Sequence, residues 1–306
     1  MRGRSLVGLI VPAAAAVASA ALAGCASDAA QRIDLDLPAK NQSQWRLPLD
    51  QYLPPLIDVE YNAQQVFVQK CMAEVGHEWI VRLDPAGTAT GESWNSAGRK
   101  LFSVHLAETY GYGNSGQISR SPEAEQAWLD GERSRRAVAE QAPEAAENCF
   151  DQSTAVLDDE PSWQVYDLAM EIAGGASGDA QESPEVKEAA SRWRECMTEA
   201  GLPDLPAVPE EMPPSSVDDG GGPAIDAPYS VGDEFDVSAE ERRVAVADAT
   251  CQDSSGYARA LYDAEWDAQA DAMKSHADDL VRYGAQLDEQ RARAESYLAE
   301  NTPEAR

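Results

Sequence analysis

Basic residues and histidines are scarce in this chain. Its 306 residues hold 24 Lys and Arg against 54 Asp and Glu, which gives a formal net charge of −30, and 3 histidines. A surface of this charge repels nucleic acid, so we expect no nucleic-acid partner. His77, His105 and His276 lie far apart and do not cluster with cysteines, so the sequence predicts neither a metal site nor a cofactor.

The familiar catalytic signatures are also missing. No G-x-S-x-G nucleophile elbow occurs, and the glycine-rich run at 174–178 lacks the lysine of a phosphate-binding loop. Carboxylates are so numerous that no single pair identifies itself as catalytic. Glu74 and Glu199, which occupy equivalent places in two similar segments, are the symmetric candidates for glycan hydrolysis. The sequence favours a protein without enzymatic activity, with an envelope hydrolase as the alternative.

Long apolar runs are absent beyond the amino-terminal segment. Arg2 and Arg4 precede an apolar stretch of about 16 residues, which is too short to span a bilayer. The Leu-Ala-Gly-Cys sequence at 22–25 follows it and resembles the lipobox of bacterial lipoproteins. We therefore expect a signal peptide at 1–24 and acyl chains on Cys25 that anchor the protein to the outer face of the plasma membrane. An ordinary cleaved signal followed by a chance cysteine is the alternative.

Cysteines are few. With Cys25 lipidated, four remain, namely Cys71, Cys149, Cys196 and Cys251. An even number in an oxidising compartment predicts two disulfides. The economical pairing is Cys71–Cys149 with Cys196–Cys251, because each bond then closes the loop within one of the two helix-loop-helix units described in the next paragraph. The pairing Cys71–Cys196 with Cys149–Cys251 remains open.

Two segments share the pattern Cys-Met-x-Glu-x-Gly and form a weak internal repeat. Residues 58–75 and 183–200 have apolar residues at helical spacing, and each predicted helix ends at a glycine, Gly76 or Gly201. The expected apolar faces hold Tyr61, Val68, Cys71, Met72 and Val75 in the first helix and Val186, Ala190, Trp193, Met197 and Ala200 in the second. Each helix precedes a loop-rich stretch and a helix with the second cysteine, so the repeat predicts two helix-loop-helix units.

The units and their linkers follow from composition. Residues 25–50 are polar and are expected to form a tether, followed by a first helical unit at 51–173. Gly174–Asp179 predicts a flexible break between the units. The second unit, at 183–300, would contain a long surface loop at 203–237 rich in Pro, Gly and Asp.

The second unit ends in a long predicted helix from Ser238 to about Ala299, with Gly256 as a possible interruption. Its apolar residues recur every seven positions and form a narrow seam, made of Trp266, Met273, Leu280 and Leu287. A seam so poor in leucine binds a partner weakly, so we expect it to pack within the chain. The predicted fold is mostly α, a disulfide-stapled helical bundle with this long C-terminal helix.

Short segments in a fixed order carry a family resemblance. They are Cys71-Met72 with Gly76, Tyr110-Gly111-Tyr112-Gly113, Ser121-Pro122-Glu123 with Trp128 and Gly131, Trp193 with Cys196-Met197 and Gly201, and Ala247-Asp248 before Cys251. Together they resemble a group of uncharacterised secreted lipoproteins of high-GC Gram-positive bacteria (actinobacteria). The resemblance implies a helical, disulfide-bonded surface lipoprotein and no particular activity. Phe102-Ser103 departs from the pattern, which has an aromatic-glycine pair at this place.

Tyr110, Tyr112 and Trp128 are the candidate recognition surface. Aromatic rings beside glycines, as at 110–113, stack on sugars or hold a peptide, so the expected partners are an envelope protein or a cell-wall glycan, besides the membrane that holds the anchor. The alternative is that these rings fill the core under a tight turn. The sequence thus predicts a cell-surface lipoprotein with a non-enzymatic binding or scaffolding role.

Overall fold

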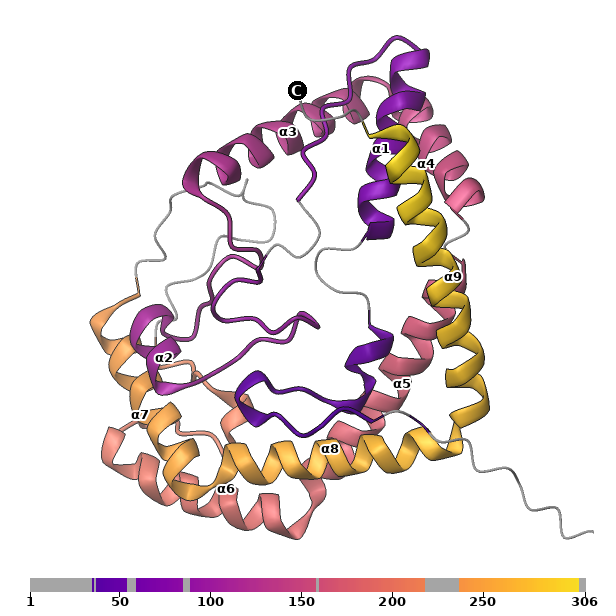
Figure 1. Cartoon of the computed structure of the whole chain (residues 1–306). Coiled ribbons are helices and arrows are strands. Elements are labelled where there is room, and N and C mark those ends of the chain that lie inside the picture. Colours follow the sequence, from indigo (N-terminus) through magenta and orange to yellow (C-terminus); the bar gives the residue numbers. More distant parts are fainter. Residues whose placement is uncertain are drawn as a thin grey trace, which may run out of the picture. The chain divides into compact units, whose positions relative to one another are not determined.

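The computed structural model describes residues 35, 37–53, 59–84, 89–157, 160–217 and 237–302 (Figure 1). Over these residues the chain is mostly helical, and its β-structure is limited to three isolated bridges. The expectation of a mostly α fold is confirmed. The predicted signal peptide and Cys25 lie outside the described residues. None of the described helices is long and apolar enough to cross a membrane.

Several of the helices begin at a serine that caps the first turn. In chain order the helices are α1 (Val59–Glu74), α2 (Val104–Tyr110), α3 (Pro122–Gln141), α4 (Pro143–Leu157), α5 (Glu160–Glu182), α6 (Pro184–Met197), α7 (Ala239–Ser255), α8 (Tyr257–Ser275) and α9 (Ala277–Asn301), with the 3-10 turns η1 (Gln42–Gln44), η2 (Pro48–Tyr52), η3 (Thr198–Ala200) and η4 (Pro209–Glu211). The hydroxyls of Ser121, Ser183 and Ser238 accept a backbone N–H from the first turns of α3, α6 and α7.

The two disulfides form the economical pairing predicted from the sequence. Cys71–Cys149 joins α1 to α4, and Cys196–Cys251 joins α6 to α7, with a Cα–Cα distance of 5.7 Å in both. This distance is ordinary for a disulfide. The alternative pairing is therefore excluded. Two such bonds are typical of a chain that folds in an oxidising compartment.

Helix α1 buries a different face from the one predicted. Val68 and Met72 are fully buried against α4, as expected, but Tyr61 and Val75 are 48% and 52% exposed, so their assignment to the core was wrong. The reason is that α1 also packs against α9, which turns Ala63 inward. The predicted cap holds, because Gly76 has a left-handed φ of 89°.

Helix α6 follows its sequence pattern closely. Val186, Ala190, Trp193 and Met197 are buried in a cluster that includes residues of α7 and α8. Gly201 has a φ of 70° and ends the segment, as predicted. Trp45, Tyr112 and Met212, which border the candidate site described below, pack against this cluster.

The predicted flexible break at Gly174–Asp179 is wrong, because α5 runs through it without interruption. A Cβ added at Gly174, Gly175 or Gly178 would meet nothing within 4 Å, so these glycines face open space. Ile172, Ala176 and Ala180 are buried on the opposite side. Packing of this side against α8, α9 and α6 offsets the low helix propensity of the glycines.

The predicted tether is shorter than expected. Leu47 and Leu49 are fully buried, and Leu49 packs with Ile172, Met273 and Leu280. Residues 41–52 are therefore part of the compact unit that begins at Leu35.

The C-terminal helical region is interrupted twice. Gly256, with a φ of 75°, separates α7 from α8, as the sequence suggested. A second break at His276 separates α8 from α9 and has no glycine or proline to signal it. Met273 and Leu280 of the predicted seam are fully buried against α5, so the seam packs within the chain as expected.

Candidate functional site

A pocket of about 470 Å³, called the Asp248 pocket below, opens where distant parts of the chain meet. It is bordered by Trp45, Lys100, Phe102, Tyr112, Pro209, Glu210, Met212, Asp248, Gln252 and Ala258. These residues come from the loop after η1, the segments on either side of α2, the region around η4, and helices α7 and α8. The volume is within the range of pockets that hold small molecules, about 300 to 1,000 Å³.

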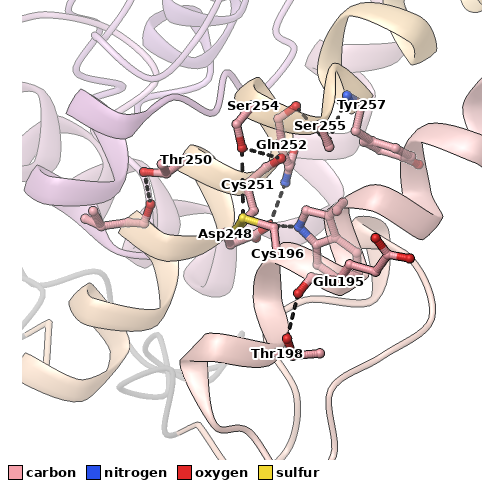
Figure 2. The surroundings of a disulfide bond; sticks show 12 residues. Glu195, Cys196, Thr198, Asp248, Thr250, Cys251, Gln252, Ser254, Ser255 and Tyr257 are labelled. Carbon is pink, nitrogen blue, oxygen red and sulfur yellow. Dashed lines mark hydrogen bonds between the residues drawn. A yellow bond between two sulfur atoms is a disulfide. The ribbon is translucent and has the colours of Figure 1, made fainter.

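Asp248 is the buried polar centre of this pocket. Asp248 is 1% exposed, and its carboxylate accepts hydrogen bonds from three side chains. The Trp193 indole N–H and the Gln252 amide donate to Oδ1 at 2.8 and 3.0 Å, and the Tyr112 hydroxyl donates to Oδ2 at 3.2 Å. Figure 2 shows Asp248 and Gln252 one turn apart on α7, joined by this hydrogen bond. Within the described part of the chain, Asp248 has no ion pair.

Burial controls the acidity of this carboxyl group. Loss of solvation raises the pKa of Asp248 to about 6, while its three hydrogen-bond donors act in the opposite direction and the charge of Glu210 adds to the rise. Asp248 therefore changes charge near pH 6, about two pH units above an ordinary aspartate.

The second disulfide positions Asp248 against its donor. Trp193 precedes Cys196 on α6 by three residues, and Asp248 precedes Cys251 on α7 by three residues. The disulfide brings these two helical turns together, as Figure 2 shows for Cys196, Cys251 and Asp248. Because residues three apart share a helix face, the indole of Trp193 then lies in reach of the carboxylate. The same bond that stabilises the fold thus shapes the site.

A second buried carboxylate, that of Glu241, contacts the backbone of Tyr112, which borders the pocket. Glu241 is 2% exposed; its Oε1 accepts the backbone N–H of Tyr112 at 2.9 Å, and its Oε2 has no hydrogen-bond partner among the described residues. Gly111 makes this approach possible, because its φ is 58° and a Cβ there would lie 2.3 Å from Oε1. Burial and the two carboxylates raise the pKa of the Tyr112 phenol, which therefore stays protonated as a donor.

Aromatic side chains form much of the remaining border. The rings of Phe102 and Tyr112 stack at a centroid distance of 5.8 Å and an interplanar angle of 12°. Trp45 has a left-handed φ of 43°, which is unusual for a large side chain, and its indole N–H donates to Glu265 at 2.9 Å. Such backbone strain often occurs at binding sites. The Trp45 ring also makes an edge-to-face contact with the ring of Tyr262, at a centroid distance of 5.4 Å, which restricts it further.

Two further charged groups, Glu210 and Lys100, border the pocket. Glu210 accepts a hydrogen bond from the hydroxyl of Tyr257 at 2.6 Å. Lys100 is exposed, and its ammonium donates to the backbone carbonyl of Tyr112. The border therefore combines apolar rings with a buried carboxylate, an exposed carboxylate and one ammonium group.

The predicted recognition residues do not form one surface. Tyr112 borders the pocket, whereas Tyr110 donates to Glu92 at 3.2 Å and Trp128 lies under the guanidinium of Arg120 at 4.7 Å. Neither Tyr110 nor Trp128 borders the Asp248 pocket. Tyr112 also packs against two core clusters, which agrees with the core role that is the alternative, while its recognition role stays a prediction.

The carboxylates chosen by symmetry are not part of the pocket. Glu74 and Glu199 are both exposed, and neither borders the Asp248 pocket. The sequence analysis named Asp248 only within a segment that carries the family resemblance, not as a site residue, and it did not name Glu210. A signal for Asp248 was present, since Val244, Asp248 and Cys251 have the spacing of one buried helix face, on which an acidic residue is out of place.

The described residues contain no group of three or more His, Cys, Asp and Glu side chains that suits a metal ion. Comparison of the chain with protein-family models, with curated proteins and with solved structures gives no match.

Proposed function

We propose that this chain is a lipid-anchored binding protein of the cell envelope that holds a small ligand in the Asp248 pocket. The observation that carries the proposal is a ligand-sized cavity whose aromatic border surrounds a buried, hydrogen-bonded carboxylate. The two disulfides fit a chain outside the cytoplasm. The lipobox-like sequence at 22–25 and the resemblance to actinobacterial surface lipoproteins support the anchor.

A binding role suits Asp248 better than a catalytic one. A catalytic acid or base must exchange a proton at an oxygen that the substrate reaches. Oδ1 of Asp248 already accepts two hydrogen bonds and Oδ2 accepts one, all from side chains of the protein. This arrangement fixes the carboxylate and orients its charge, which is what a binding pocket needs.

The anchor is tested by mass spectrometry of the amino-terminal peptide from native membranes. We expect a peptide that begins at Cys25 and carries acyl chains. A Cys25→Ala variant should leave the membrane fraction, whereas a Ser27→Ala control should stay in it. An unmodified Cys25, or a Cys25→Ala variant that remains membrane-bound, would contradict the anchor.

The pocket is tested by native mass spectrometry of the protein extracted from its own membranes. We expect a bound small molecule on the wild type that is lost from Trp45→Ala, which removes part of the pocket border. Trp163→Ala is the matched control, because this tryptophan is 61% exposed and lies outside the Asp248 pocket. Wild-type protein without ligand, or equal occupancy in both variants, would contradict the proposal.

A glycan hydrolase remains the second candidate, on one observation. Asp248, with its pKa raised to about 6, and Glu210 border the same pocket, and glycoside hydrolysis uses a pair of carboxyl groups at one site. Release of reducing ends from purified cell-wall glycan would support this activity if Asp248→Asn and Glu210→Gln each abolished it. No release by the wild-type protein would remove the candidate.

A further inference from the structure

The charges at the Asp248 pocket do not balance. Asp248 and Glu241 are both buried, at 1% and 2% exposure, and neither has an ion pair in the described part of the chain. Glu210 adds a third carboxylate at the border. Among the described residues that border the pocket, Lys100 is the one cation, and it is exposed. A buried carboxylate without a counter-ion is unfavourable, and a cationic ligand would relieve this cost.

The border is also suited to one kind of cation. Inorganic cations and simple ammonium ions are strongly hydrated, and the pocket's apolar rings would not replace that hydration. An alkylated ammonium group carries its charge on an apolar surface, so it loses less on leaving water and is attracted by aromatic faces. Trp45, Phe102 and Tyr112 supply such rings in the border of the pocket that also holds the carboxylate of Asp248.

We propose that the Asp248 pocket binds an organic cation that carries an alkylated ammonium group, held by the rings of Trp45, Phe102 and Tyr112 and by the charge of Asp248. The proposal rests on the binding function proposed above and adds the chemical class of the ligand. Anionic ligands are disfavoured, because Asp248 and Glu210 border the pocket and Glu241 lies against the backbone of Tyr112, whereas the border has a single ammonium group, which is exposed.

The first test compares choline with its neutral carbon isostere, in which carbon replaces the nitrogen. The two have nearly the same shape and differ in charge. Isothermal titration calorimetry uses the full-length protein in a nonionic detergent. We expect choline to bind at least about tenfold more tightly than the isostere, and more tightly than ethanolamine, whose ammonium is not alkylated. Equal affinity for choline and the isostere, or no choline binding, would overturn the proposal.

The second test changes the charge of the pocket in both directions. Asp248→Asn keeps the size of the side chain and should weaken choline binding about tenfold or more. Lys100→Gln removes the like charge and should tighten it a few-fold. Asp253→Asn, on an exposed position of α7, is the control for net charge and should leave the affinity unchanged. The reverse result, tighter choline binding by Asp248→Asn and weaker binding by Lys100→Gln, would contradict the proposal.

The outcomes separate this proposal from the one on which it rests. A pocket that binds the neutral isostere as well as choline, and loses both in Trp45→Ala, is a binding site without a preference for cations. In that case the binding function stands and the cation is refuted. If native protein carries no ligand and neither compound binds, both proposals fail.

Discussion

Asp248→Asn should make this protein more stable at neutral pH. In the folded state Asp248 is buried without a counter-ion, and its pKa is raised to about 6. Asparagine has nearly the same shape, keeps an oxygen that accepts from Trp193 and Gln252, and carries no charge. The hydroxyl of Tyr112 can turn to accept from the new amide. The substitution therefore removes the cost of a buried charge and retains the hydrogen bonds.

The size and sign of the effect follow from the pKa. An unfolded aspartate has a pKa of about 4, so the folded group differs by about two units, which corresponds to about 3 kcal/mol. Because the folded state holds the proton more tightly, Asp248 contributes this stability below about pH 4 and loses it as the pH rises to about 6. The free energy of unfolding of Asp248→Asn, relative to wild type, should therefore increase by about 3 kcal/mol between pH 4 and pH 7.

Urea unfolding followed by circular dichroism, at several pH values between these limits, measures the difference. Subtraction of the two proteins at each pH cancels the titration of the other carboxylates, provided that they act independently of Asp248. Asp253→Asn, on an exposed turn of the same helix, is the control and should give a difference that does not vary with pH. The reasoning is refuted if the Asp248→Asn difference is also independent of pH, or if it grows toward low pH.

Three further predictions concern the architecture of the site. Gly111→Ala should destabilise the fold by about 1 to 3 kcal/mol in urea unfolding, because its Cβ would lie 2.3 Å from Glu241 Oε1, whereas Gly178→Ala, in open space on α5, should stabilise it by about 0.5 to 1 kcal/mol. Replacement of Cys196 and Cys251 together by alanine should cost about 4 kcal/mol in chain entropy and lower the melting temperature; an unchanged melting temperature would contradict this. Trp193→Phe removes a buried donor to Asp248, so it should cost about 1 to 3 kcal/mol in the same assay, and a neutral effect would contradict the hydrogen bond.

Features set by local sequence were predictable. Helix α6 begins directly after Ser183, whose hydroxyl caps its first turn, and the 3-10 turn η3 that continues it ends at Gly201, which has a left-handed φ. The disulfide pairing followed from the repeat, and Trp193 and Met197 were correctly assigned to the core by their spacing.

Features set by long-range packing were not predictable. The glycines at 174–178 favour a break, and only the contacts of α5 with its neighbouring helices keep this segment helical. The pocket is still more difficult to predict, because its border is formed by residues from distant parts of the chain, such as Trp45, Phe102 and Asp248. No local pattern places Trp45 or Phe102 beside Asp248, and the helical spacing of Asp248 indicates a buried face but not the residues that face it.

The most direct test of the account is the titration of the Asp248 carboxyl group itself. Carbon NMR of aspartate-labelled protein, assigned with Asp248→Asn, follows its side-chain chemical shift against pH. The account predicts a midpoint near pH 6 in the free protein, and a shift to lower pH when choline is added, because a bound cation stabilises the carboxylate. A midpoint near pH 4 that choline does not move would contradict both the buried charge and the cation that we propose to pair with it.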